Sequence, residues 1–352
     1  MFQFQILHQE QHTAARTGMI TTSHGPLHTP AFVPLATQAS VKALTPQQVE
    51  DIGFESVMAN TYHLYFQPGI ETVQLFGGLH RFMNWNKPLW TDSGGFQIFS
   101  LPKKYRKVTD EGVLFRSPAR PDFHLLTPER AITVQQQLGA DIIFTFDECI
   151  AHDSDYRQAK QALQRTHQWA ERCVKEFHKS NRDQALYGII QGGKFSDLRT
   201  ASAQFISTLS VDGFGLGSLF GEPKEETKQI AQVMMNALPE EKPKHFLGIG
   251  SIDDFFMYVE MGGDTFDCVL PTRLGRQGYV FLRPESGGVV QNKFRMRITH
   301  GRWKNDPTPI DRQCSCYVCQ HFSRAYIYHL GTAKELLFYT LTTYHNLFYF
   351  QR

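Results

Sequence analysis

The sequence predicts an α/β protein built as an eight-fold β/α (TIM) barrel with a smaller subdomain at its C-terminal end. Eight short apolar runs recur between residues 31 and 270, and most lead into a stretch whose apolar residues have helical spacing. Polar or glycine residues follow each run, and 352 residues is a length that a barrel uses as one unit. Eight repeats of strand and helix favour a closed barrel over a doubly wound sheet.

The apolar runs are the predicted strands, and they lie at Ala31–Pro34, Ser56–Asn60, Leu89–Thr91, Asp141–Phe146, Leu186–Ile190, Gly213–Leu216, Phe246–Ile249 and Phe266–Leu270. The helices predicted from apolar spacing lie at Tyr156–Phe177, Phe195–Leu209, Glu225–Leu238 and Ile252–Met261. A further helix is expected to follow Thr127 as its N-cap, with Pro128 at its first position and Gly139 at its end.

The alternation of strands and helices is interrupted at two places. Lys107–Phe115 predict a hairpin inserted after the third strand. After Leu270 the alternation ends altogether. We therefore expect residues 1–271 to form the barrel and residues 272–352 to form a subdomain integrated with it.

The N-terminal sequence, the apolar runs and the cysteine spacing together predict the cellular compartment of the protein. The N-terminus, Met1–Ile6, has neither a basic segment nor a long apolar run, and no segment approaches the roughly 20 apolar residues that cross a bilayer. Three of the six cysteines lie within six residues, a spacing typical of a metal site in a reducing compartment rather than of disulfides. We expect a cytoplasmic protein that does not enter a membrane.

Polar residues that follow the predicted strands indicate an active site. Barrel enzymes keep their chemistry at the carboxyl ends of the strands, so these residues would share one rim. They are Asn60, Asp92, Asp147, Gln191, Ser218, Gly248 and Asp267. A single Asp after a strand is commonly a helix cap, but three on one rim beside a glycine-rich turn favour catalysis.

The glycine-rich turn Trp90–Gln97 predicts a site for a planar heterocycle. Gly94 and Gly95 leave the backbone open to a flat ligand, and Phe96 supplies a ring face. Asp92 and Gln97 supply groups for the edge of the heterocycle. A simple strand and tight turn is the alternative interpretation of these eight residues.

The cysteine run Cys314-Ser315-Cys316-Tyr317-Val318-Cys319 predicts a metal site. Three thiolates at this spacing can bind one tetrahedral ion, and a fourth protein ligand would make it a structural zinc site. The spacing leaves three candidates for the fourth ligand: His321, His329 and His345.

The segment from Thr272 to Lys304 is basic, although the whole chain has a formal net charge of only +2. It carries one acid, Glu285, and eight cations: Arg273, Arg276, Arg283, Lys293, Arg295, Arg297, Arg302 and Lys304. A polyanionic partner and a merely solvated charged face are both consistent with this band.

With these residues assembled, the chain closely resembles the tRNA-guanine transglycosylases, also called queuine tRNA-ribosyltransferases, from about Thr17 to His345. The motifs that carry the resemblance are Asn60-Thr61-Tyr62-His63-Leu64, Thr91-Asp92-Ser93-Gly94-Gly95-Phe96-Gln97, Phe146-Asp147-Glu148-Cys149, Gly188-Ile189-Ile190-Gln191-Gly192-Gly193, Phe266-Asp267-Cys268-Val269-Leu270-Pro271-Thr272-Arg273, the cysteine run and Tyr344-His345-Asn346.

The resemblance implies an enzyme that exchanges the wobble guanine of GUN-anticodon tRNAs for a 7-deazaguanine, on the route to queuosine. It implies that Asp267 attacks the ribose C1′ and holds the tRNA covalently, while Asp92 is the general acid/base. The incoming base would be queuine or 7-aminomethyl-7-deazaguanine. Bacterial members of the family are typically homodimers with one structural zinc per chain.

The resemblance also assigns binding residues. It implies that the base is held by Asp92, Ser93, Gly94, Gly95, Phe96, Asp147, Gln191, Gly217, Ser218, Leu219 and Leu247. It implies tRNA contacts at Gly248, Ile249, Gly250, Ser251, Ile252, Asp253, Asp254, Thr272, Arg273, Leu274, Gly275 and Arg276. It selects His345 as the fourth zinc ligand beside Cys314, Cys316 and Cys319.

Two departures from the family pattern bear on function. The loop Gly217–Glu222 is one residue shorter than in bacterial or animal members, which favours queuine as the incoming base. Family members usually continue well past the zinc histidine, whereas this sequence ends seven residues after His345, which could weaken the subdomain or the homodimer.

Two other functions fit parts of the pattern. A non-catalytic RNA-binding accessory subunit of the family would have lost catalytic carboxylates, but Asp92, Asp147 and Asp267 are all present. A metallohydrolase barrel would need histidine and carboxylate metal ligands on the rim, and the rim residues do not supply such a set.

Overall fold

The computed structural model describes residues 2–117, 122–180, 182–217 and 224–352. Eight parallel strands form one sheet whose neighbours in space are also neighbours along the chain: β4 (Ala31–Pro34), β5 (Val57–Ala59), β6 (Leu89–Thr91), β10 (Ile142–Phe144), β11 (Ala185–Ile190), β12 (Gly213–Leu216), β13 (Lys244–Phe246) and β14 (Thr265–Cys268). β14 pairs with β4, and a parallel bridge between Leu35 and Met58 joins β4 to β5. The sheet therefore closes on itself, which confirms the predicted β/α barrel.

Strand β13 is the strand whose predicted position is wrong. The prediction placed it at Phe246–Ile249, whereas the structure places it at Lys244–Phe246. Lys244 and His245 are polar but buried, so the apolar pattern passed over them. Gly248 has a φ of 78°, which ends the extended backbone where the prediction continued it. Leu270, predicted as the end of the last strand, is instead the first residue of a helix.

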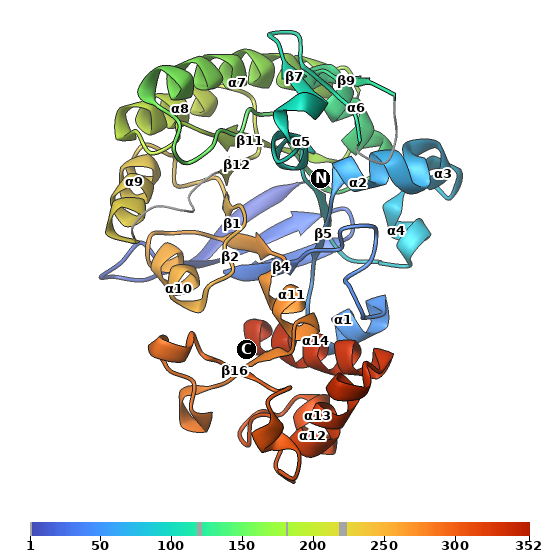
Figure 1. Ribbon diagram of the computed structural model, residues 1–352. Helices are drawn as coiled ribbons and strands as arrows, with labels where there is room; N and C mark the ends of the chain where they lie inside the picture. Colours follow the sequence, from blue (N-terminus) through green and yellow to red (C-terminus); the bar gives the residue numbers. More distant parts are fainter. Residues whose placement is uncertain (1, 118–121, 181, 218–223) are drawn as a thin grey trace.

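Helices cover the outside of the barrel (Figure 1). The five that the sequence predicted are α6 (Pro128–Leu138), α7 (Tyr156–Phe177), α8 (Ser196–Ser207), α9 (Lys224–Asn236) and α10 (Ile252–Glu260). As expected, the Thr127 hydroxyl caps α6 by accepting from the Arg130 amide at 3.2 Å, and Gly139 ends that helix with a φ of 77°.

Shorter helices follow the first three barrel strands. They are α1 (Pro46–Ile52), α2 (Thr61–Leu64), α3 (Ile70–Leu75), α4 (Leu79–Met83) and α5 (Gly95–Phe99), with a π-helical turn η1 (Tyr65–Gly69) between α2 and α3. None of the helices in the described part of the chain has the length and apolar character needed to cross a membrane.

An insertion after β6 forms its own small antiparallel sheet. Its strands are β7 (Arg106–Val108), β8 (Val113–Phe115) and β9 (His124–Leu126), preceded by a 3₁₀ turn η2 (Lys103–Tyr105). Pairing of β7 with β8 confirms the predicted hairpin, and β9 adds a third strand that the sequence pattern did not predict.

An N-terminal antiparallel sheet, which the sequence analysis missed, covers the amino end of the barrel. It consists of β1 (Gln3–Gln9), β2 (Arg16–Thr22) and β3 (Gly25–Thr29). Ile20 and Leu27 of this sheet belong to the same buried apolar cluster as Trp90 and Phe144 of the barrel strands. The side chains of this sheet therefore complete the apolar core inside the barrel at its amino end.

A buried ion pair fastens this N-terminal sheet to the barrel. Arg16 of β2 donates to both carboxylate oxygens of Asp264, at 2.8 Å through Nε and 2.7 Å through Nη2. The side chains are only 4% and 0% exposed, and the Lys244 amide also donates to Asp264 at 2.7 Å. A bidentate pair with a further donor keeps both buried charges satisfied.

The segment after the barrel packs closely on it. Its elements are α11 (Leu270–Arg276), β15 (Tyr279–Phe281), η3 (Pro284–Ser286), η4 (Val290–Asn292), β16 (Arg295–Arg297), η5 (Gly301–Trp303), α12 (Tyr317–His321), α13 (Arg324–Ala333) and α14 (Leu336–Gln351). In Figure 1 helices α12 and α13 (red) lie at the lower end of the molecule, below α14. α14 contacts α11, α1 and β4, so the C-terminal segment and the barrel share one apolar core. A domain boundary at residue 271 remains a prediction.

We expect Asp264→Asn to lower the free energy of unfolding by about 3 kcal/mol, because removing one charge leaves the buried Arg16 guanidinium uncompensated. Urea denaturation followed by circular dichroism measures this change. Glu176→Gln is the matched control, since its partner Lys179 is 62% exposed and the loss should stay below about 1 kcal/mol. Equal losses for the two variants would contradict the role assigned to the buried pair.

Candidate active site and metal centre

Asp92 lies at the carboxyl end of β6, where three donors hold its carboxylate. The Thr61 amide donates to Oδ1 at 2.7 Å. Asn60 Nδ2 and Gln97 Nε2 donate to Oδ2 at 2.5 and 2.7 Å. Asn60 and Thr61 follow β5, so the ends of two adjacent strands fix this carboxylate together.

Asp147 forms a second polar group on the same rim. Ser93 Oγ donates to its Oδ1 at 3.1 Å, and Gln191 Nε2 donates to its Oδ2 at 2.7 Å. The Cys149 thiol also donates to Oδ2, at 3.3 Å. Asp147 and Gln191 are 2% and 3% exposed, so the pair forms a pre-organised, nearly dry polar wall.

Asp267 supplies the third carboxylate from within β14. Its Oδ1 accepts from the Gly248 amide and from His245 Nε2, both at 3.1 Å. The residue is 6% exposed. Its side chain therefore lies almost entirely inside the mouth of the barrel.

The three carboxylates act on one another electrostatically. Burial raises the pKa of Asp92, and the negative charge of Asp267 raises it further against the hydrogen bonds that lower it. Burial also raises the pKa of Asp147, with a smaller contribution from the charge of Asp92. Closure of the barrel has therefore brought together carboxylates that lie up to 175 positions apart in the sequence, as predicted.

Two glycines leave the space that these side chains fill. A Cβ on Gly95 would lie 3.0 Å from the Asp147 carbonyl oxygen, and one on Gly217 would lie 2.7 Å from Gln191 Nε2. Gly94 has a φ of 80°, which strongly favours glycine at the start of α5. The glycine-rich turn is thus required by close packing around Asp147, in addition to any access it gives a ligand.

The remaining predicted base-binding residues are placed as follows. Phe96 is 52% exposed at the rim. Leu247 is partly buried and packs against the apolar cluster inside the barrel. Ser218 and Leu219 lie outside the described residues. Their contact with a base remains a prediction.

The predicted tRNA-contacting residues divide by exposure. Gly248, Ser251 and Arg273 are exposed, and Ile252, Asp253, Asp254 and Arg276 are partly exposed. Those that are buried are Ile249, Gly250, Thr272, Leu274 and Gly275. The buried members can shape the loops but have little side-chain surface to offer a partner.

Two buried side chains at the site had no sequence signal. His245 contacts Asp267 from inside β13, and a histidine within a strand has no recognisable pattern. Arg199 of α8 is fully buried and donates to the carbonyl oxygens of Gly193 at 2.8 Å and Gly217 at 2.7 Å. It thereby joins the backbone after β11 to the backbone after β12.

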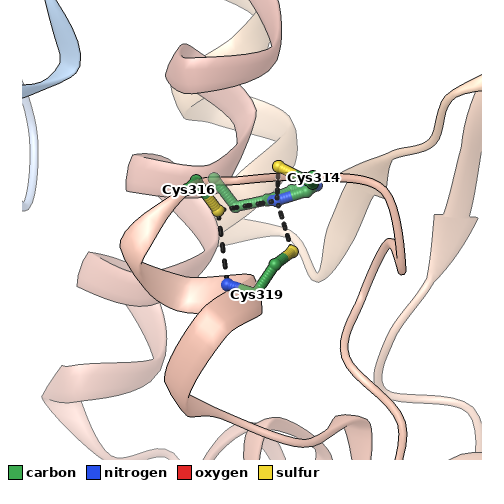
Figure 2. A group of neighbouring side chains, drawn as sticks. Cys314, Cys316 and Cys319 are labelled. Carbon is green, nitrogen blue, oxygen red and sulfur yellow. Dashed lines mark hydrogen bonds between the residues drawn. The ribbon is translucent and has the colours of Figure 1, made fainter.

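The cysteine run and one histidine form a compact donor set in the C-terminal segment. Figure 2 shows Cys314, Cys316 and Cys319 turned toward one another. His345 Nδ1 lies 3.9, 3.5 and 3.4 Å from their three sulfur atoms. Zinc bonds of about 2.3 Å to sulfur and 2.0 Å to nitrogen, at a tetrahedral angle, separate these atoms by roughly 3.5 Å. The four residues can therefore hold a tetrahedral metal ion.

The ring of His345 is oriented for this role. Its Nε2 donates to the Phe281 carbonyl oxygen at 2.8 Å, which leaves Nδ1 facing the sulfurs as an acceptor. His345 is fully buried, whereas His321 and His329 are exposed and stand outside the cluster. The structure thus decides among the three histidines that spacing left open.

Comparison with known proteins places the chain in a family. A family model described as queuine tRNA-ribosyltransferase matches residues 11–352. The chain is 46% identical over 348 residues to the queuine tRNA-ribosyltransferase of Desulforamulus reducens, covering 99% of this chain and 91% of that protein. It is 45% identical over 347 residues to the protein of the same name from Halothermothrix orenii, covering 98% and 90%.

A relative from Archaeoglobus fulgidus, named as a putative queuine tRNA-ribosyltransferase, is 42% identical over 365 aligned positions, covering 95% of this chain and 90% of that protein. The match to the family model, over residues 11–352, spans both the barrel and the C-terminal segment. The chain belongs to the queuine tRNA-ribosyltransferase family.

Proposed function

We propose that this protein is a tRNA-guanine transglycosylase, which exchanges the wobble guanine of GUN-anticodon tRNAs for a 7-deazaguanine in queuosine modification. The observation that carries the proposal is that Asp92 and Asp267 lie on the same rim of the barrel, in a chain that belongs to this family. The two carboxylates differ in surroundings: Asp92 has a raised pKa, whereas Asp267 is held through a single oxygen. Different surroundings suit an acid and a nucleophile.

In the first displacement, Asp267 attacks the ribose C1′ of the wobble nucleotide. A bond forms between C1′ and a carboxylate oxygen, and the glycosidic bond breaks with its electron pair left on the guanine ring nitrogen. Asp92, whose raised pKa favours the protonated acid, gives that nitrogen a proton. Neutral guanine leaves, and the tRNA remains as an ester of Asp267.

In the second displacement, the incoming 7-deazaguanine replaces the enzyme. Asp92, now a carboxylate, takes the proton from the ring nitrogen of the new base, which attacks C1′. The ester bond breaks and Asp267 recovers its charge. Two inversions at C1′ retain the configuration of the nucleotide, as in a retaining glycosidase.

Asp147 and Gln191 are positioned to select the base. Guanine and 7-deazaguanines both present N–H donors along one ring edge, and a buried carboxylate is an acceptor for such an edge. Because Asp147 is 2% exposed, a ring without those donors would cover the carboxylate without giving it a further hydrogen bond. Queuine and 7-aminomethyl-7-deazaguanine share this edge and differ at position 7. The shortened loop Gly217–Glu222 favours queuine, although residues 218–223 lie outside the described chain.

A structural zinc ion at Cys314, Cys316, Cys319 and His345 completes the proposal. Four protein ligands leave no position for a water, so the ion supplies rigidity and no catalytic chemistry. We also propose a cytoplasmic homodimer with tRNA, the free base and guanine as its ligands. A non-catalytic accessory subunit remains the alternative, and the preserved carboxylates argue against it.

Asp267→Asn is expected to abolish both guanine exchange and the covalent adduct, because an amide oxygen is a poor nucleophile. Adduct formation is read on denaturing gels, and exchange by incorporation of radiolabelled guanine into tRNA. Asp92→Asn should suppress turnover, since the base proton then has no acceptor. An adduct formed by Asp267→Asn would refute the nucleophile. Absence of exchange by the wild-type protein with a GUN tRNA would favour the accessory subunit.

Cys316→Ser is expected to lose the metal and cooperative folding together, because metal-binding free energy in such a cluster is folding free energy. Elemental analysis should give one zinc per wild-type chain, and thermal unfolding followed by circular dichroism reports stability. Cys149→Ser is the control, since that thiol lies outside the cluster, and its zinc content should equal that of the wild type. Full zinc content in Cys316→Ser would contradict the proposed ligand set.

Replacing Arg273 and Arg276 by Ala should weaken tRNA binding and leave binding of the free base nearly unchanged. Each lost phosphate contact should reduce the slope of log affinity against log salt by about 1. Fluorescence anisotropy of labelled tRNA at several salt concentrations measures the slope. Lys179→Ala, near the amino end of the barrel, is the control. Equal loss of tRNA and base affinity would mean that the arginines shape the pocket.

A further inference from the structure

His245 occupies the interior of the barrel directly beneath Asp267. Strands β13 and β14 pair in parallel register with His245 opposite Thr265. Side chains two apart on a strand point to the same face, so Thr265 and Asp267 both face the side on which His245 lies. The neighbours Phe246 and Phe266 point away, stacked on each other with ring centroids 5.6 Å apart.

Both ring nitrogens of His245 have partners on β14. Nε2 lies 3.1 Å from Asp267 Oδ1, and Nδ1 lies 2.9 Å from Thr265 Oγ1. A carboxylate only accepts, so Nε2 carries the proton and donates to Asp267. Nδ1 is then the acceptor of the Thr265 hydroxyl, which fixes the tautomer as well as the ring plane.

Aromatic packing removes the remaining freedom of the imidazole. Its centroid lies 4.9 Å from that of Trp90 and 5.5 Å from that of Phe144. His245 and both of these rings are 0% exposed. An imidazole packed in this way holds its N–H in a fixed position, which a mobile or solvated donor would not do.

The bonds that Asp267 accepts within the described chain both end on Oδ1, from His245 and from the Gly248 amide. Two donors on one oxygen define the plane of the carboxylate and leave Oδ2 as the oxygen that can form a new bond. We infer that His245 is a positioning residue for the nucleophile: it anchors Oδ1 of Asp267 so that Oδ2 faces the ribose C1′. This inference rests on the proposed function, because it assumes that Asp267 is the nucleophile.

The simpler alternative is a core histidine whose hydrogen bonds contribute only to stability. The two roles differ in what a substitution changes. Loss of a purely stabilising contact lowers the unfolding temperature and leaves the chemical step intact. Loss of an anchor slows formation of the ester while tRNA affinity persists, because the fully buried His245 has no exposed surface of its own to offer the tRNA.

The experiment compares three variants of the zinc-loaded full-length protein. His245→Phe keeps a ring against Trp90 and Phe144 but has no donor. In His245→Gln the amide nitrogen reaches the position of Nε2, whereas in His245→Asn it reaches only that of Nδ1. The rate of adduct formation in a single turnover, with enzyme in excess over GUN tRNA, is followed on denaturing gels beside tRNA affinity and the unfolding temperature.

We expect His245→Phe to form the adduct about 10- to 100-fold more slowly, the range that follows from losing a hydrogen bond to a charged group. Its tRNA dissociation constant should stay within about threefold of the wild type. His245→Gln should recover most of the rate and His245→Asn should not. His80→Gln is the matched control: His80 is also buried and contacts a carboxylate, Asp141, at the amino end, so only stability should change.

Wild-type rates in a folded His245→Phe variant would overturn the inference. If that variant does not fold, equal rates for His245→Gln and His245→Asn would overturn it in the same way, since only one of these can reach Asp267. Failure of the wild-type protein itself to form an adduct would instead remove the proposed function. The two failures are therefore distinguishable in one gel series.

Discussion

Closure of the barrel is the constraint on which the active site depends. The ladder between β14 and β4, with the single bridge from β4 to β5, brings the last strand beside the first. Only then do the ends of β6, β10 and β14 point their carboxylates into one mouth. The bidentate pair of Arg16 and Asp264 lies at the opposite end of β14 from Asp267, so the strand that carries the proposed nucleophile is held at both ends.

The electrostatics of this rim follow from burying several carboxylates close to one another. Burial and mutual repulsion raise the pKa values of Asp92 and Asp147, a cost to stability that amide and hydroxyl donors offset in part. Asp267 is supported differently, by one backbone amide and one buried imidazole on the same oxygen. Distinct surroundings for otherwise identical groups suit the two roles proposed here, in which one carboxyl group carries a proton and another forms a bond.

Helix α14 connects the cysteine–histidine cluster to the barrel. His345 turns one ring nitrogen to the cysteines and donates through the other to the Phe281 carbonyl of β15. The next residue, Asn346, bonds the Phe281 amide and the carbonyls of Pro271 and Tyr279. Two consecutive side chains thus tie the cluster, strand β15 and helix α11 into one unit.

The sequence by itself determined the repeating strand and helix pattern, the carboxylates that follow the strands and the three cysteines of the candidate metal site, because each can be recognised from its immediate neighbours along the chain. It could not place strand β13, whose buried Lys244 and His245 break the apolar pattern, nor the N-terminal sheet, whose strands pair locally but fill a barrel formed later in the chain. The spacing of the cysteines also left three histidines as candidates for the fourth metal ligand. Those choices depend on contacts between residues far apart in sequence, and only the tertiary structure decides which side chains meet.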